Sequence, residues 1–249
     1  MKCDKMEVVI PMSILLYGKN PALEVLNSKR KIIQAFIQEN FNRDIYEKLQ
    51  GMNVPITIMN KKRFDEKFTG LTQGIVIEVE DYKILSLKEI IDKLDINSNP
   101  LIVMLDGIQD PHNFGAIIRS SEAGGVKAII IPKDRSASVN ATVVKTSSGA
   151  IEYIDIVEVV NLNQAAEQLK KSGYWVVGTS LDAISNYEDI FVDRPLCLVI
   201  GSEGKGMKRL LKENCDLLVK IPMEGKINSL NASVGAAIII FDILRRKKG

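Results

Sequence analysis

Apolar residues form short, nearly continuous runs along the second part of the chain, and longer polar stretches separate these runs. Strands that are apolar throughout, without alternation, are typical of a parallel sheet buried on both faces. Regular exchange between such strands and helix-length segments predicts an α/β domain of about 150 residues. The predicted strands are Leu101–Leu105, Ala128–Ile131, Tyr174–Gly178, Leu196–Ile200 and Leu217–Ile221.

The segments between these strands predict helices over Phe114–Ala123 and Asn163–Ser172, and a last helix from Ser229 to about Arg246. Asn228 or Ser229 can cap the last helix, because a short polar side chain accepts hydrogen bonds from the first free backbone N–H groups.

The first 80 or so residues predict a smaller α/β unit. A helix is expected to start at Asn20-Pro21, and apolar residues recur at roughly helical spacing from Leu23 to Ile37. Ile75–Glu80 alternates between apolar and polar residues towards its end, which predicts a strand. A polar, helix-like stretch at Leu87–Leu94 and four turn-forming residues follow. We therefore expect an N-terminal domain over residues 1–80, a linker over 81–100 and a second domain over 101–249.

Composition limits the classes of protein that this chain can belong to. Of its 249 residues, 46% are hydrophobic and 26% charged, as in an ordinary soluble globular protein. The formal charge of +2 excludes a strongly basic nucleic-acid binder but allows a local basic face. Three cysteines and one histidine disfavour a zinc site, so we expect free thiols and no metal. The apolar runs are shorter than the ~20 residues that span a bilayer, so we expect a cytoplasmic protein without membrane contact.

Polar loops follow three of the predicted strands. The first, Asp106–Gly115, leads into a helix on which Arg119 lies one turn beyond Gly115. Ligands of open α/β sheets gather at the carboxyl ends of strands, and a helix N-terminus with a nearby arginine favours a phosphate. The alternative is that these residues only turn the chain and cap the helix. His112, the single histidine, is either a general base or, as its place in a turn favours, a structural hydrogen-bonding residue.

The second loop, Gly201–Met207, is rich in glycine but matches neither common phosphate-binding pattern. A Walker loop requires Lys and then Ser or Thr after its second glycine, and the dinucleotide pattern fails after Gly206 as well. What remains is a turn in which missing side chains let the backbone approach a ligand closely. Glu203 in this turn is either a cap for the next helix or a functional carboxylate. The third loop, Ile221–Ser233, leads into the last helix.

Taken in order, these loops resemble the three motifs of the SpoU/TrmH ribose 2′-O-methyltransferases. The resemblance is dense over about residues 100–249. It is weaker over Tyr17–Pro21 and Gln73–Val76, which are similar to the RNA-binding N-terminal domain of a bacterial branch that methylates a guanosine ribose in large-subunit ribosomal RNA. Thr72 departs from that branch, whose members often have histidine there. The matching motifs are Asn113-Phe114-Gly115 with Arg119, Gly201–Met207, and Ile221-Pro222 followed by Ser229-Leu230-Asn231.

The resemblance implies a fold and a chemistry that the residues alone do not. It implies an α/β trefoil knot in the second domain, a homodimer, and S-adenosylmethionine bound in the knot. It assigns the cofactor site to Thr179, Ser180, Gly201, Ile221 and Leu230. It assigns catalysis to Asn113, Arg119, Glu203, Ser229 and Asn231.

Arg119 is often assigned in this family as the group that accepts the 2′-hydroxyl proton. A guanidinium stays protonated up to about pH 12, so we expect Arg119 to act mainly as an electrostatic clamp on a phosphate or a developing alkoxide. Two alternatives to an enzyme of ribosomal RNA remain open. One is the same chemistry on transfer RNA, and the other is a non-catalytic RNA-binding factor of ribosome assembly on the same fold.

Overall fold

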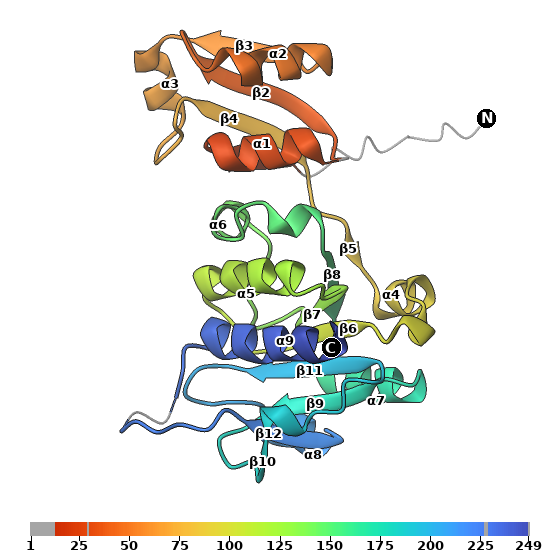
Figure 1. The fold of residues 1–249 in the computed structure, drawn as a ribbon. Coiled ribbons are helices and arrows are strands. Elements are labelled where there is room, and N and C mark those ends of the chain that lie inside the picture. Colours follow the sequence, from red (N-terminus) through yellow and green to blue (C-terminus); the bar gives the residue numbers. More distant parts are fainter. Residues whose placement is uncertain (1–12, 29, 227–228, 249) are drawn as a thin grey trace, which may run out of the picture. The chain divides into compact units, whose positions relative to one another are not determined.

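A computed structural model describes residues 13–28, 30–226 and 229–248. The chain divides into two compact units, with the boundary between Tyr82 and Lys83. Figure 1 colours the smaller unit from red to orange and the larger one from yellow to blue. Each unit has a sheet of its own, and the two are described separately below.

The smaller unit is built on a four-stranded sheet with the order β1-β4-β2-β3. Both β1 and β2 pair antiparallel with β4, and β3 pairs parallel with β2. The strand predicted at residues 75–80 is confirmed as β4. The strands are β1 (Ser13–Tyr17), β2 (Ile32–Gln38), β3 (Ile56–Met59) and β4 (Ile75–Glu80).

Three helices accompany this sheet, α1 (Lys19–Asn27), α2 (Arg43–Gly51) and α3 (Lys61–Lys67). The helical spacing expected to run on to Ile37 is wrong beyond Asn27, because the chain extends at Ser28 and residues 32–38 form β2 between two other strands. Aromatic rings fill the core against the sheet. The ring centroids of Phe36 and Phe64 lie 5.0 and 5.1 Å from the ring centroid of Phe68.

The larger unit is built on an eight-stranded sheet with the order β10-β12-β9-β11-β6-β7-β8-β5, and its neighbouring strands run parallel. The five predicted strands are all present, each shifted by one residue or less. They are β6 (Leu101–Asp106), β7 (Ala128–Pro132), β9 (Trp175–Thr179), β11 (Leu196–Gly201) and β12 (Leu217–Lys220). Three strands were not predicted, β5 (Ile84–Leu85), β8 (Asp155–Val159) and β10 (Ser185–Asn186).

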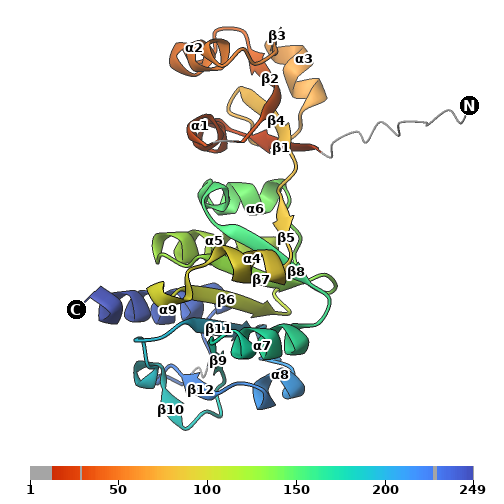
Figure 2. The same ribbon diagram turned by 90° about the vertical axis from the view of Figure 1, so that its right-hand side faces the viewer.

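Helices cover both faces of this sheet. On one face α4, α7 and α8 contribute to a single apolar core with the strands. Figures 1 and 2 show α5 and α9 side by side, and these two helices pack directly against each other. The helices are α4 (Leu87–Lys93), α5 (Pro111–Ala123), α6 (Ala141–Thr146), α7 (Leu162–Lys171), α8 (Arg209–Glu213) and α9 (Ala232–Lys248). No helix in the described ranges is long and apolar enough to cross a membrane.

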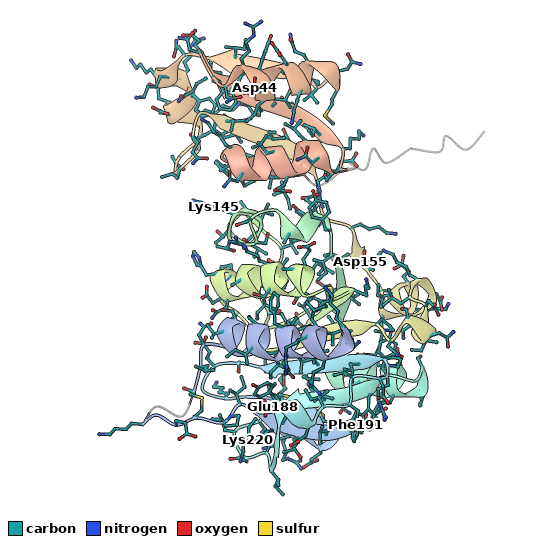
Figure 3. The ribbon with its side chains drawn as sticks, viewed as in Figure 1. Asp44, Lys145, Asp155, Glu188, Phe191 and Lys220 are labelled. Carbon is teal, nitrogen blue, oxygen red and sulfur yellow. The ribbon has the colours of Figure 1, made fainter. Side chains whose placement is uncertain are left out.

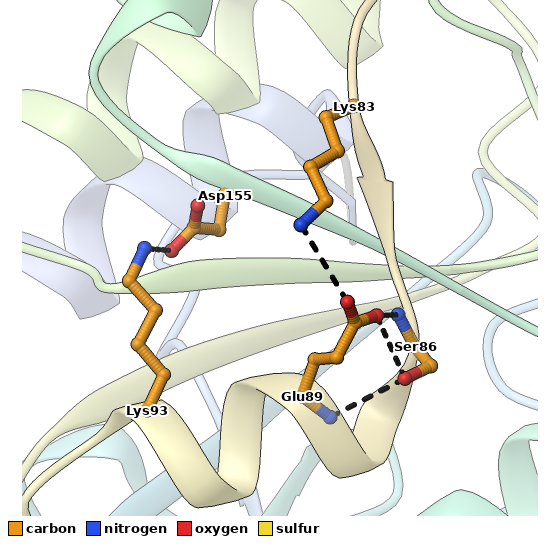
Figure 4. A network of polar contacts seen from close by, with 5 residues as sticks. All are labelled: Lys83, Ser86, Glu89, Lys93 and Asp155. Carbon is orange, nitrogen blue, oxygen red and sulfur yellow. Dashed lines mark hydrogen bonds and ion pairs between the residues drawn. The ribbon is translucent and has the colours of Figure 1, made fainter.

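The segment expected to be a linker, residues 81–100, is largely built into the larger unit. It holds β5, which pairs with β8, and α4, whose Lys93 forms an ion pair with Asp155 of β8 at 2.5 Å. Figure 4 shows this pair beside a capping box, in which the Ser86 hydroxyl and the Glu89 carboxylate cap α4 reciprocally. Polar composition suggested a free connection, but capping and pairing with a distant strand fix the segment in place.

The last helix begins at Ala232, three residues later than expected. Its cap is Asn231, whose side-chain oxygen accepts hydrogen bonds from the backbone N–H groups of Ser233 and Val234 at 2.9 and 3.4 Å. Ser229 is therefore not the cap, since a capping side chain reaches only the amides two or three positions ahead. Asn228, the other expected cap, lies outside the described residues.

The thiols of Cys197 and Cys215 are free, as expected, and both lie in the core of the larger unit. Burial raises the pKa of Cys215 to about 12, so its thiol stays protonated at neutral pH. Cys3 lies outside the described residues.

Candidate active site

Four neighbouring strands of the larger sheet, in the order β12-β9-β11-β6, end at the same edge because they run parallel. The loops that follow them contain the three predicted motifs and the Thr179-Ser180 segment. This edge is where open α/β sheets bind their ligands. Figure 3 labels Lys220, the last residue of β12, on this part of the unit.

A hydrogen-bonded network joins the three loops through Glu203. One carboxylate oxygen accepts from the Asn113 amide at 3.1 Å, from the Asn231 amide at 2.7 Å and from the backbone N–H of Ala232 at 3.1 Å. The Asn231 amide also donates to the Asn113 side-chain oxygen at 2.8 Å. Of the two interpretations of Glu203, a cap for the next helix is excluded, because its side chain caps no residue of α8, the helix that follows it. The carboxylate instead holds the start of α9.

The Asn113–Glu203–Asn231 network fixes side chains from positions far apart in the sequence. Charge-assisted hydrogen bonds to a carboxylate are about twice as strong as neutral ones, so the exposed network can still hold its geometry. The same Asn231 side chain caps α9, and the start of that helix is thereby coupled to the loops of β6 and β11. Three of the five predicted catalytic residues are brought together in this way.

The five predicted cofactor residues line one cavity of about 550 Å³. A volume of this size is typical of sites for small organic ligands. Apolar side chains of Ile200 and Ile239 and the backbone of the glycine turn contribute to the same wall, and so do Glu203, Ser229 and Asn231. The members predicted from the sequence are Thr179, Ser180, Gly201, Ile221 and Leu230.

Close packing of the backbone at this cavity leaves no room for a side chain on Gly201. A Cβ on Gly201 would lie 2.4 Å from the carbonyl carbon of Gly206 and 2.5 Å from the backbone nitrogen of Met207. Two backbone hydrogen bonds between Ser202 and Gly206, of 2.9 and 3.1 Å, close the turn at that point. The sequence suggested that missing side chains admit a ligand, whereas at Gly201 the missing side chain admits a neighbouring stretch of backbone.

Arg119 lies apart from the other predicted catalytic residues. It is exposed in the second half of α5, it lines neither this cavity nor the adjoining one, and it forms no ion pair with any described residue. The expectation that it would project towards the β6 loop is not met by the geometry of a single chain. His112 contributes its backbone N–H to the Asp110 cap of α5 at 3.0 Å, and it too lines neither cavity.

A second cavity of about 530 Å³ adjoins the first, and the predicted loops Asp106–Gly115 and Gly201–Met207 supply all of its lining except Arg135 and Lys208. Asp106, at the end of β6, is buried there and accepts a hydrogen bond from the backbone N–H of Lys208 at 2.7 Å. Lys205 and Arg135 also line it. Asp106 follows a buried strand directly, which is a usable signal, but nothing in the sequence around Arg135 marks it.

Comparison with known proteins agrees with this fold. Residues 100–241 match the SpoU rRNA Methylase family, and residues 15–85 match the domain described as RNA 2′-O ribose methyltransferase substrate binding. The chain belongs to the SpoU rRNA methylase family of RNA 2′-O-methyltransferases, which confirms the resemblance found in its motifs.

Relatives match over nearly their whole length. A TrmH family protein of Bacillus subtilis is 40% identical over 235 residues, which is 92% of this chain and 94% of the relative. The 23S rRNA (guanosine-2′-O-)-methyltransferase RlmB of Vibrio parahaemolyticus is 40% identical over 238 residues, 93% of this chain and 96% of the relative.

Solved structures share the fold. The SpoU methyltransferase AviRb from Streptomyces viridochromogenes, in complex with the cofactor AdoMet, superposes with a TM-score of 0.83 at 23% identity. The match covers 95% of this chain and 91% of that one.

Proposed function

We propose that this protein transfers a methyl group from S-adenosylmethionine to the ribose 2′-hydroxyl of a guanosine in large-subunit, 23S ribosomal RNA. The observation that carries the proposal is the cavity lined by all five predicted cofactor residues, with the Asn113–Glu203–Asn231 network in or beside its wall. The RlmB relative, which matches over nearly the whole chain, is named for this reaction and substrate. Ribosomal RNA is a cytoplasmic substrate, so we propose the cytoplasm as the place of action.

The residues at the cavity fit an adenosine-like cofactor. Ile200, Ile221 and Leu230 offer apolar surface to a purine, and the turn after Gly201 offers backbone groups. S-adenosylmethionine, when bound, supplies an electrophilic methyl group. The protein's part is to hold the ribose in line with that methyl group, because orientation alone removes much of the barrier to such a reaction.

The acceptor hydroxyl must lose its proton as the oxygen is methylated. A guanidinium has donors but no acceptor, so we assign Arg119 to stabilising the developing alkoxide or the adjacent phosphate rather than to taking the proton. Asn113 and Asn231 are held by Glu203 and supply polar groups next to the cavity, and Ser229 supplies a further hydroxyl in its wall.

We propose a homodimer formed through the outer face of α9. Val234, Ile238 and Phe241 recur there at helical spacing and are 37–47% exposed, a row of large apolar side chains that water would otherwise cover. The neighbouring helix α5 carries the exposed Arg119. Burial of this row against a second copy would bring Arg119 towards the other chain, which would explain its distance from the site of its own chain.

We also propose that the path of the chain forms the trefoil knot of this family. Strand β12 lies near one edge of the sheet, yet α9 packs on α5 and β11 near the middle. The connection between them is tied to the turn after β11 by the hydrogen bonds of Asn231 and Ala232 to Glu203. Both features support this proposal, in which the C-terminal segment passes back through a loop.

For the smaller unit we propose a role in holding RNA, because residues 15–85 match a substrate-binding domain. Lys19 lies over the Phe41 ring at 5.7 Å and Lys67 over Phe36 at 4.1 Å. Basic groups close to aromatic rings suit single-stranded nucleic acid, which binds through phosphates and stacked bases.

The test is methyl transfer from labelled S-adenosylmethionine to unmodified 23S ribosomal RNA, with transfer RNA as the competing substrate. We expect label in an alkali-resistant 2′-O-methylated nucleotide of the ribosomal RNA, and loss of that label in the Asn113→Ala variant. Label only in transfer RNA would favour the first alternative. Binding of the cofactor without transfer to either RNA would favour an assembly factor.

A further inference from the structure

The second cavity is lined by charged side chains, among them Arg135, to which the predicted site gives no role. Its walls come from the loop after β6, the loop after β7 and the turn after β11. It shares Ser202, Glu203 and the stretch from Lys205 to Met207 with the cofactor cavity. A molecule bound in one cavity therefore lies next to a molecule bound in the other.

The acidic groups of the second cavity already have partners. Asp106 accepts from the Lys208 backbone and lies 3.4 Å from the Lys208 ammonium. Asp110 caps α5, and one carboxylate oxygen of Glu203 accepts from two amides and a backbone N–H.

The basic groups are less completely paired. Within residues 13–28, 30–226 and 229–248, the side chains of Arg135 and Lys205 form no ion pair and no hydrogen bond. The guanidinium of Arg135 and the ammonium of Lys205 are thus free to donate to a ligand in a cavity large enough for a small organic molecule. Free cationic donors of this kind suit the oxygens of an anionic group.

Arg135 is held in an unusual backbone conformation. Its φ is 60°, in the left-handed region that non-glycine residues seldom adopt. Two residues later, the backbone N–H of Ala137 donates to the carbonyl of Ile108 at 2.8 Å, which ties the β7 loop to the β6 loop across the cavity. Strained residues that the surrounding structure holds in place are found preferentially at functional sites.

We propose that the second cavity binds the acceptor nucleotide and that Arg135 holds a phosphate next to the ribose that is methylated. The inference rests on the proposed function, since it takes RNA as the ligand. A guanidinium matches the two free oxygens of a phosphodiester through paired hydrogen bonds, and Lys205 supplies a second positive charge in the lining of the same cavity. Arg135 is thus a positioning residue for the RNA and has no part in binding the cofactor.

The experiment compares Arg135→Gly and Arg135→Lys with the unchanged full chain. Glycine adopts a φ of 60° without strain, so the first variant removes the guanidinium and leaves the backbone free to keep its path. Lysine keeps the charge but loses the planar fork. Lys171→Ala is the control, because it removes one exposed charge at the end of α7, before β9, and so at the opposite edge of the sheet.

The measurements are the KM for in vitro transcribed 23S ribosomal RNA, the salt dependence of its binding, and the affinity for S-adenosylmethionine. For Arg135→Gly we expect a KM for the RNA about ten- to hundredfold higher and an unchanged affinity for the cofactor. The RNA affinity should also fall less steeply with salt concentration, by the amount that corresponds to the loss of about one phosphate contact. Arg135→Lys should recover part of the loss, and Lys171→Ala should behave as the parent.

An unchanged KM and salt slope in Arg135→Gly, with an active parent protein, would overturn the inference and leave the proposed function standing. A loss of cofactor affinity equal to the loss in KM would overturn it too, because the role would then be structural. A parent protein that methylates no RNA would overturn the proposed function, and the inference with it.

Discussion

The two units of the chain place their apolar residues differently. In the smaller one, a mixed sheet packs against a cluster of aromatic rings around Phe64 and Phe68. In the larger one, the central strands are buried from end to end, as β6 shows, and helices cover both faces. Polar residues of the larger sheet therefore collect where strands end.

This difference determines where the functional groups of the larger unit lie. A parallel sheet brings the carboxyl ends of four strands to one edge, and the loops there supply Asn113, Glu203 and Asn231 to a single network. In the smaller unit, Lys19 and Lys67 each lie beside an aromatic ring, at separate places in the sequence. Catalysis needs convergent groups and RNA affinity needs distributed charge, so we expect the two activities to be separable by substitution.

The largest effect should come from Phe64→Ala in the smaller unit. Phe64 is fully buried, and its loss should cost about 3–5 kcal/mol of the free energy of unfolding. This is a large part of the stability of a unit of its size. We expect weak RNA binding and an early unfolding transition by circular dichroism, with S-adenosylmethionine affinity kept in titration calorimetry.

Ile58→Ala is the matched control, since Ile58 lies in the same sheet but is 55% exposed. It should change the unfolding free energy by less than about 0.5 kcal/mol. Loss of cofactor affinity in Phe64→Ala would show that the units do not behave independently.

Arg119→Ala tests the chemistry of the larger unit. Removing a group that stabilises developing negative charge typically lowers kcat by about 10²–10³. Because Arg119 lines neither cavity of its own chain, the affinity for S-adenosylmethionine should change little. Single-turnover methyl transfer measures the rate, and Arg119→Lys should restore only part of it. Full activity of Arg119→Ala would refute its assigned role.

Gly201→Ala should weaken cofactor binding by about ten- to hundredfold, or 1.4–2.8 kcal/mol. The added Cβ meets backbone atoms 2.4 and 2.5 Å away, which cannot rotate out of its path, so the turn must shift. Gly51→Ala is the control, because its Cβ at the end of α2 meets nothing within 4 Å. Calorimetry on both variants measures the affinity for S-adenosylmethionine. Equal affinities of the two variants would show that the turn shifts without weakening cofactor binding.

The sequence predicts secondary structure correctly where all residues of an element lie in similar surroundings. The five predicted strands of the larger unit are apolar over most of their length, and the core residues of the central ones are buried, so their pattern has one interpretation. β5 and β10 have two residues each, too few to form a pattern. Residues 32–38 have a spacing that suits a helix or a strand equally well, and pairing with β3 and β4 decides between the two.

The same distinction holds at the site. The motifs identified Asn113, Glu203 and Asn231, but the hydrogen bonds that give Glu203 its role reach 90 and 28 residues along the chain. Arg135 belongs to no motif, and its left-handed backbone is imposed by the loops around it rather than by its own residue type.

The smallest effect concerns the capping box of α4, which fixes the segment next to the boundary of the two units (Figure 4). Ser86→Ala removes the cap and should cost about 1 kcal/mol of the unfolding free energy at pH 7. The hydrogen bonds from Ser86, backbone first and side chain second, lower the pKa of Glu89 below its usual value. Methyl transfer should be unchanged, because α4 lines neither cavity.

The pKa of Glu89 gives this prediction a pH signature. A carboxyl whose pKa is lower in the folded chain stabilises the fold above its unfolded pKa, and that contribution is lost as the pH falls through the folded value. The gap in unfolding free energy between the parent and Ser86→Ala should therefore narrow on acidification below about pH 4, measured by urea unfolding. Glu89→Gln keeps an acceptor for the cap but has no proton to bind, so the gap between Glu89→Gln and the double variant Glu89→Gln/Ser86→Ala should stay constant with pH. A gap that narrows equally in both series would assign the acid sensitivity to other carboxyls of the chain.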